Sequence, residues 1–176
     1  MVALLRGINV GGSGTLPMAS LRGIATSVGL DEVRTYIQSG NLVFVSGQGS
    51  ADAVASALRS AITSSTGLDP QVIVRTSDEL ATVVDANPFL RRGDDPGHLH
   101  VMFLAADAAA SIEGLDVRAR LPEEAIALDR ELHLSLPGGM GRSKLAADLA
   151  RRLGPAGTVR NWRTVTTLLA MARELA

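Results

Sequence analysis

The chain has 176 residues, of which 46% are hydrophobic and 20% are charged, and its net charge is −1. This composition suits one compact domain or two small ones and excludes an evenly basic coat for nucleic acid. The absence of cysteine excludes disulfides, a thiol nucleophile and a thiolate metal site, and no apolar run approaches the roughly 18 residues of a membrane span.

The first half of the chain predicts the order strand, helix, strand, strand, helix, strand. Met1 leads directly into apolar residues with no basic segment before them, so we expect no signal peptide and a cytoplasmic location. The apolar run over 2–9 is typical of a buried central strand, and Gly40-Asn41 predicts a two-residue hairpin turn. The other predicted elements are helices over 17–28 and 51–65 and strands over 33–38, 42–45 and 71–75. This order is the ferredoxin-like split βαβ pattern.

The second half partly repeats this order. A helix over 77–85 is predicted to begin with a Ser77 cap, and Asn87-Pro88 breaks it. The elements expected after it are a polar loop over 91–97, a strand over 98–104, a short helix over 107–114, a hairpin of 124–128 and 132–136, and helices over 142–153 and from about 161. We therefore expect an α+β protein of two ferredoxin-like halves, residues 1–76 and 77–176, which share an interface. Each half would have a mostly antiparallel sheet with helices packed on it.

The first segment that could carry chemistry is LLRGINVGG, in which a strand runs into a glycine-rich loop before a helix. Such loops present backbone N–H groups to anions, and Asn9, Gly11 and Gly12 would line this one. The spacing fits neither G-x-G-x-x-G nor a Walker loop. Arg6 is placed within the buried strand, where a charge must be paired or must face a cavity. A structural ion pair and a ligand contact both remain open for Arg6.

The second segment is VRTYIQSGN. Strand alternation puts Arg34, Tyr36 and Gln38 on one face, which could form an RNA platform. Aromatic residues make up only 3% of the chain, which argues against stacked bases. Ser39-Gly40-Asn41 is either part of a site or simply a favourable turn.

The third segment, GGMGRSKL, leads into a predicted helix. Arg142, Ser143 and Lys144 would lie at the positive end of that helix, where a phosphate or carboxylate could bind. Lys144 is the one lysine among 17 basic residues, which suggests that the position needs an ammonium group. The alternative is a capped helix with solvated cations, because capping alone explains Ser143.

The fourth segment, TVRNWRT, starts the last helix. Asn161 is a credible N-cap flanked by Arg160 and Arg163, and Trp162 shares the buried helical period, so we expect it in the core. This segment belongs to a C-terminal stretch, 138–176, that holds seven basic residues against two acidic ones and so hints at an anionic partner.

The three histidines, His98, His100 and His133, do not form a pattern that converges on a metal ion. The sequence therefore predicts neither a metal site nor a cofactor.

The strings LLRGINVGG, PMASLR, VRTYIQSGNLVF, VIVRT, NPF, GRSKL and RNWRTV occur in this order over nearly the whole chain. Together they closely resemble the bacterial family called domain of unknown function 1697. The resemblance implies a duplicated, ferredoxin-like α+β fold and no known activity. The loop Gly12-Ser13-Gly14-Thr15 departs from the family in lacking a basic residue. The resemblance nominates, without roles, Arg6, Asn9, Ser39, Asn41, Arg142, Ser143, Lys144, Asn161 and Arg163.

Three functions remain open at this point. The first is binding of an anion, namely a nucleotide, a phosphorylated metabolite or a nucleic-acid backbone. The second is an enzyme that uses Lys144, Ser143 and Tyr36 as acid and base groups. The third is an interaction module, which could pair with a second copy as a homodimer. The enzyme hypothesis requires its groups in one pocket. Convergence of the four segments on one cleft would indicate a site, whereas dispersed segments would make their residues mostly folding devices.

Overall fold

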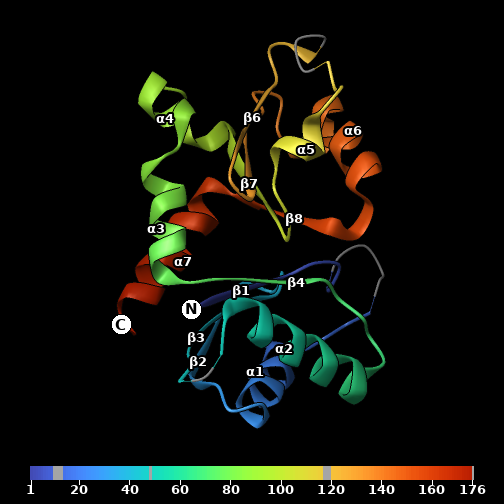
Figure 1. Ribbon diagram of the computed structural model, residues 1–176, viewed down its shortest axis with the longest axis vertical. Coiled ribbons are helices and arrows are strands. Elements are labelled where there is room, and N and C mark those ends of the chain that lie inside the picture. The colour runs from blue at the N-terminus through green and yellow to red at the C-terminus, as the bar shows by residue number, and fades with distance from the viewer. Residues whose placement is uncertain (10–13, 48, 117–119, 176) are drawn as a thin grey trace. The chain divides into compact units, whose positions relative to one another are not determined.

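The computed structural model describes residues 1–9, 14–47, 49–116 and 120–175 (Figure 1). The chain divides into two compact units, Met1–Ala81 with Thr167–Ala176, and Thr82–Thr166. Each unit contains one four-stranded sheet. Residues 167–176, expected in the second half, group by compactness with the first unit.

The first unit is built on the sheet order β2-β3-β1-β4, in which neighbouring strands are antiparallel. Its elements are β1 (Val2–Leu5), α1 (Met18–Ser27), β2 (Asp31–Tyr36), β3 (Asn41–Val45), α2 (Ala51–Thr66) and β4 (Val72–Arg75). Helices α1 and α2 cover one face of this sheet (Figure 1). The core between them contains Leu21, Leu42, Phe44, Leu58 and Ile62, each fully buried.

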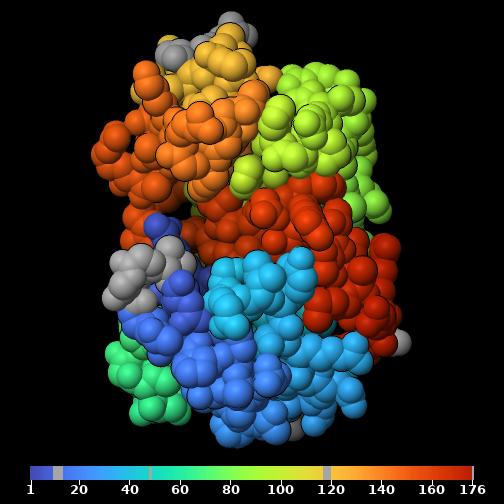
Figure 2. Space-filling model, turned by 180° about the vertical axis from the view of Figure 1, so that it is seen from behind, coloured from blue at the N-terminus to red at the C-terminus, as the bar shows by residue number. Residues whose placement is uncertain are grey.

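The C-terminal end of the chain belongs to this unit because it lies beside β2. Nη1 of Arg34 donates to Oε2 of Glu174 at 3.0 Å. Figure 2 shows the red C-terminal end next to the light-blue strand and hairpin, which lie at the surface of the unit.

Two features of the first unit differ from the prediction. Strand β1 ends at Leu5 rather than Asn9, because Gly7 and Asn9 have positive φ angles of 76° and 55°, which turn the chain out of the extended conformation. The hairpin loop covers 37–40, so the prediction of a two-residue turn at Gly40-Asn41 is wrong. Ile37 takes the left-handed conformation, with φ 49°, and the fully buried Asn41 joins β3 opposite Tyr36.

The second unit has the sheet order β6-β7-β5-β8, also with antiparallel neighbours. Its elements are β5 (Leu99–Leu104), α5 (Ala109–Ile112), β6 (Glu124–Leu128), β7 (Glu131–Ser135), α6 (Lys144–Leu153) and β8 (Gly157–Asn161). Leu132, Leu134 and Leu145 lie in the buried cluster on the α6 side of the sheet. Both sheets therefore follow the same order of elements and the same order of strands.

The remaining helices are α3 (Ser77–Asp85), α4 (Pro88–Arg92), α7 (Trp162–Arg173) and the 3₁₀ turns η1 (Pro96–His98), η3 (Met140–Arg142) and η4 (Gly154–Ala156). The prediction missed β8 and α4. Asn87 does not simply break a helix. Its Oδ1 caps α4 by accepting from the N–H groups of Phe89 and Leu90, and Pro88 occupies the first helical position.

Of the two predicted N-caps, the one of α3 is wrong and the one of α7 is confirmed. Thr76, not Ser77, caps α3, because its Oγ1 accepts from the N–H of Glu79. Asn161 caps α7 as predicted, with Oδ1 accepting from the N–H of Thr164 at 2.8 Å. Trp162, expected in the core, is 7% exposed. Over the described residues, the helices are too short or too polar to cross a membrane.

Candidate functional site

Asn9 ties the first candidate segment to the second. Its Nδ2 donates to the carbonyl groups of Leu16 at 2.8 Å and Gln38 at 2.9 Å, and its Oδ1 accepts from the N–H of Leu16 at 2.8 Å. The N–H of Leu5 donates to the carbonyl of Gly40. The first and second segments therefore meet in the first unit. The side-chain amide of Asn9 that joins them bonds to backbone groups of Leu16 and Gln38.

The second segment is held by its own polar groups. Nδ2 of Asn41 donates to the carbonyl of Tyr36 and to Oγ of Ser39, both at 3.0 Å. A side chain on Gly40 would come within 2.6 Å of Ile8 Cδ1, and Gly40 has φ 74°, so this position requires glycine. These contacts fold the hairpin onto the end of β1. Tyr36 is half-buried at the end of β2.

Arg6 lies outside the strand in which it was expected. Because β1 ends at Leu5, the half-buried Arg6 follows it, and its N–H donates to the carbonyl of Gln71 at 2.9 Å. The premise of a charge inside a strand is therefore wrong. The candidates Gly11 and Gly12 lie outside the described residues.

At the start of α6, in the third segment, two backbone N–H groups already donate hydrogen bonds to side chains of the protein itself. Ser143 is 5% exposed, and its Oγ accepts from the N–H of Ala146 at 2.9 Å. Oε2 of Glu123 accepts from the N–H of Leu145, also at 2.9 Å. A carboxylate therefore already lies where an anionic ligand was expected. Arg142 and Lys144 are exposed beside it.

The fourth segment contains a buried arginine. Nη1 of Arg160 donates to Oγ1 of Thr158 at 2.7 Å and to the carbonyl of Val159 at 2.9 Å. Burial lowers the pKa of Arg160 to about 10. Arg163 is exposed on α7. The third and fourth segments belong to the second unit, and the convergence of all four segments on one cleft stays a prediction.

A hollow that was not predicted from the sequence lies beside α6. We call it the arginine hollow. It has a volume of about 320 Å³ and is lined by Leu115, Arg120, Asp148, Arg151 and Arg152. The sequence signal that could have found it is the Arg151-Arg152 pair in the basic C-terminal stretch. The partner Arg120 is distant in the chain and carried no such signal.

Ion pairs organise the arginine hollow around Asp148. Arg120 donates to Oδ2 of Asp148 from Nε at 2.7 Å and from Nη2 at 2.6 Å, and Arg151 reaches Oδ1 at 3.0 Å. The hydrogen bond from Arg120 is the main cause that lowers the pKa of Asp148. Arg152 donates to the carbonyl of Glu113. Two guanidinium groups, those of Arg120 and Arg151, thus share the Asp148 carboxylate, and Arg152 adds a third positive charge to the lining.

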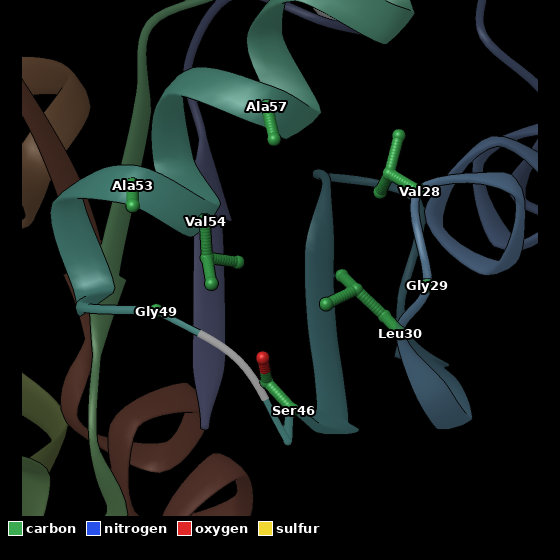
Figure 3. A pocket seen from close by; sticks show the side chains of 8 residues that line it. All are labelled: Val28, Gly29, Leu30, Ser46, Gly49, Ala53, Val54 and Ala57. Atoms are coloured by element: carbon green, nitrogen blue, oxygen red, sulfur yellow. The ribbon is translucent and has the colours of Figure 1, made fainter.

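A second cavity, which we call the apolar groove, lies in the first unit (Figure 3). It has a volume of about 290 Å³ and is lined by Val28, Gly29, Leu30, Ser46, Gly49, Ala53, Val54 and Ala57. These residues come from the turn after α1, the chain that follows β3 and the first turns of α2. None of them carries a charge.

The histidines are dispersed. His98 ends η1, so the strand predicted over 98–104 begins one residue later, at Leu99, and includes His100 but not His98. His133 on β7 is 1% exposed, and burial lowers its pKa to about 4. Nδ1 of His133 has no hydrogen-bond partner. No three His, Asp or Glu side chains within the described ranges could together hold a metal ion.

These features define an α+β protein with two antiparallel four-stranded sheets of identical strand order. The chain belongs to the family described as "Protein of unknown function (DUF1697)", whose model matches residues 1–133, which confirms the resemblance. It is also similar to the structure of conserved bacterial protein SP0830 from Streptococcus pneumoniae, with a TM-score of 0.76 and 22% identity over 97% of both chains. That likeness concerns the fold alone. No curated protein matches the chain.

Proposed function

We propose that the protein binds a small anion of the phosphate class in the arginine hollow. The observation that carries this proposal is the placement of Arg120, Arg151 and Arg152 around one hollow, in which Asp148 is the one acidic residue among the five that are described as lining it. Guanidinium groups offer paired N–H donors that match phosphate and carboxylate oxygens. The side chain of Arg151 is 77% exposed, so it can turn from Asp148 to a ligand at little energetic cost.

The arginine hollow is favoured over the start of α6. At that start, Glu123 and Ser143 already accept the N–H groups of Leu145 and Ala146. An anion bound there would have to displace a carboxylate of the protein. The arginines at the hollow form one small basic cluster, and the net charge of the whole chain is −1. A small phosphate therefore fits the hollow better than the long backbone of a nucleic acid.

Titration calorimetry with inorganic phosphate at low ionic strength tests this proposal. We expect Arg151→Gln and Arg152→Gln each to weaken binding about tenfold, because each removes a charge-assisted hydrogen bond. Two matched controls, Lys144→Gln at the start of α6 and Arg173→Gln at the end of α7, should bind phosphate like the parent protein.

Two results would contradict the proposal. One is the absence of any phosphate binding by the parent protein. The other is a loss of binding in Lys144→Gln with no loss in Arg152→Gln, which would return the site to the start of α6.

We further propose that the chain arose by duplication of a ferredoxin-like unit, with its halves divided near residue 76, and that it acts in the cytoplasm. The repeated strand order supports the duplication. Arg75 in β4 and Arg160 in β8 support it as well. Each is buried, each donates Nη1 to the carbonyl of the residue before it, and each precedes a helix N-cap. The absence of cysteine supports the proposed location.

A further inference from the structure

We propose that the apolar groove is a binding site for a small neutral molecule with an apolar body and one hydrogen-bonding group. This site is separate from the arginine hollow, because its residues all belong to the first unit and its ligand has a different chemistry. The inference therefore does not depend on the proposed anion site.

The shape of the groove follows from local structure. Helix α1 ends at Ser27, and Gly29, with φ 84°, turns the chain into β2. On the opposite side, Ala53 and Ala57 are one helical turn apart on α2, so their methyl groups line the same wall. These short side chains leave open the space between the two helices that larger side chains would fill. Figure 3 shows this space bordered by Val28, Ala57 and Val54.

The base of the groove is apolar and firmly placed. Leu30 is 4% exposed and Val54 is 6% exposed, and both belong to the core of the first unit. Because these side chains are packed from behind, a ligand would meet a preformed apolar surface and would not need to order it. Concave apolar sites of this kind bind small molecules by covering such surface from water.

The lining also defines the charge of the ligand. Among the eight lining residues, Ser46 has the one polar side chain, and its oxygen points toward the open space in Figure 3. No lining side chain could neutralise a charged ligand, and moving an unpaired charge out of water is costly. The volume of about 290 Å³ equals that of roughly ten water molecules in the liquid, so the ligand has roughly ten non-hydrogen atoms.

Methyl NMR spectroscopy of the full chain tests this site with three probes of matched shape: 4-tert-butylphenol, 4-tert-butylbenzoate and 4-tert-butylbenzylammonium. We expect the neutral phenol to shift the methyl signals of Val28, Leu30 and Val54, and to bind at least about tenfold more tightly than either ion. Ala57→Leu fills the groove and should weaken phenol binding by about tenfold or more. Ala147→Leu, an exposed position on α6, is the matched control and should change nothing.

Ser46→Ala provides a second variant that leaves the shape of the groove intact. We expect it to weaken binding of the phenol but not of tert-butylbenzene, which lacks the hydroxyl group. Equal binding of all three probes, or phenol binding unaffected by Ala57→Leu, would overturn the proposal. Shifts of the groove methyl groups that depend on protein concentration without any probe would assign the groove to a second copy of the chain and would overturn it as well.

Discussion

At the scale of single residues, Asn9 connects two segments through three hydrogen bonds. Its Nδ2 and Oδ1 both bond to the backbone of Leu16, and its Nδ2 also donates to the carbonyl of Gln38. Asn is also one of the few residues that accept its φ of 55° without much strain. The family motif residue Asn9 is therefore explained by folding without any ligand.

Asn9→Asp should lower the free energy of unfolding by about 1–3 kcal/mol, because it keeps the acceptor and removes the donors to the carbonyl groups of the buried Leu16 and the exposed Gln38. Urea denaturation followed by circular dichroism measures the change. Gln38→Ala is the control, since it keeps the main-chain carbonyl that Asn9 contacts, and it should remain within about 0.5 kcal/mol of the parent protein. Equal stability of Asn9→Asp and the parent would show that these bonds do not support the fold.

His133 makes the stability of the protein depend on pH. Burial lowers its pKa from 6.5 to about 4 in the folded state, so below pH 6.5 the unfolded chain takes up a proton that the folded protein does not. The folded state is therefore favoured at neutral pH and loses this contribution as the pH falls from 6.5 toward 4.

Between pH 7.5 and pH 5, His133 should account for a loss of about 2 kcal/mol in the free energy of unfolding. His133→Leu should remove that part of the pH dependence, whatever its effect on stability at pH 7.5. Urea denaturation curves at the two pH values measure it. The same difference between pH 7.5 and pH 5 in both proteins would disprove the assignment to His133.

At the scale of elements, the start of α3 shows how a cap is chosen. The N–H of Thr76 donates to Oε2 of Glu79 at 2.7 Å, and the N–H of Glu79 donates to Oγ1 of Thr76 at 3.1 Å. This reciprocal pair is a capping box. The prediction of Ser77 as the cap misplaced the helix start by one residue, although the spacing from Thr76 to Glu79 was visible in the sequence.

Thr76→Ala should therefore destabilise the protein by about 1 kcal/mol, because it leaves a helix N–H without its acceptor. Ser77→Ala is the matched control at the neighbouring position and should change stability by less than about 0.5 kcal/mol. Thermal denaturation of both variants distinguishes the two caps. A larger effect of Ser77→Ala would restore the original prediction.

Strand β8 shows why some elements escape a reading of the sequence. Thr158 and Arg160 are both buried, so polar residues occupy positions where a strand pattern is expected to show apolar ones. The strand exists because it pairs with β5 over five residues, with Val159 opposite Met102. A side chain at Gly157 would come within 2.6 Å of Leu104. None of these partners is near β8 in the sequence.

At the scale of the whole molecule, the repeated strand order is the main feature. The prediction of an α+β fold with mostly antiparallel sheets is confirmed, and the six elements of the first half appear in the predicted order. In the second half, β8 was not predicted, so the repeat expected from the sequence was only partial. The likeness to SP0830 over 97% of both chains shows that nearly the whole chain has the fold of a solved structure.

Local pattern was enough to predict most helices and strands and the family, because periodicity, capping residues and turn residues act within a few positions of the chain. The site depended on tertiary structure. Glu123 closes the start of α6 from 22 residues upstream, and Arg120 reaches Asp148 across 28 residues. Ion pairs and cavities form between residues that folding brings together, so their members share no fixed spacing in the sequence. For this reason the anion site that we propose is the arginine hollow, and not the glycine-rich start of α6 that the sequence favoured.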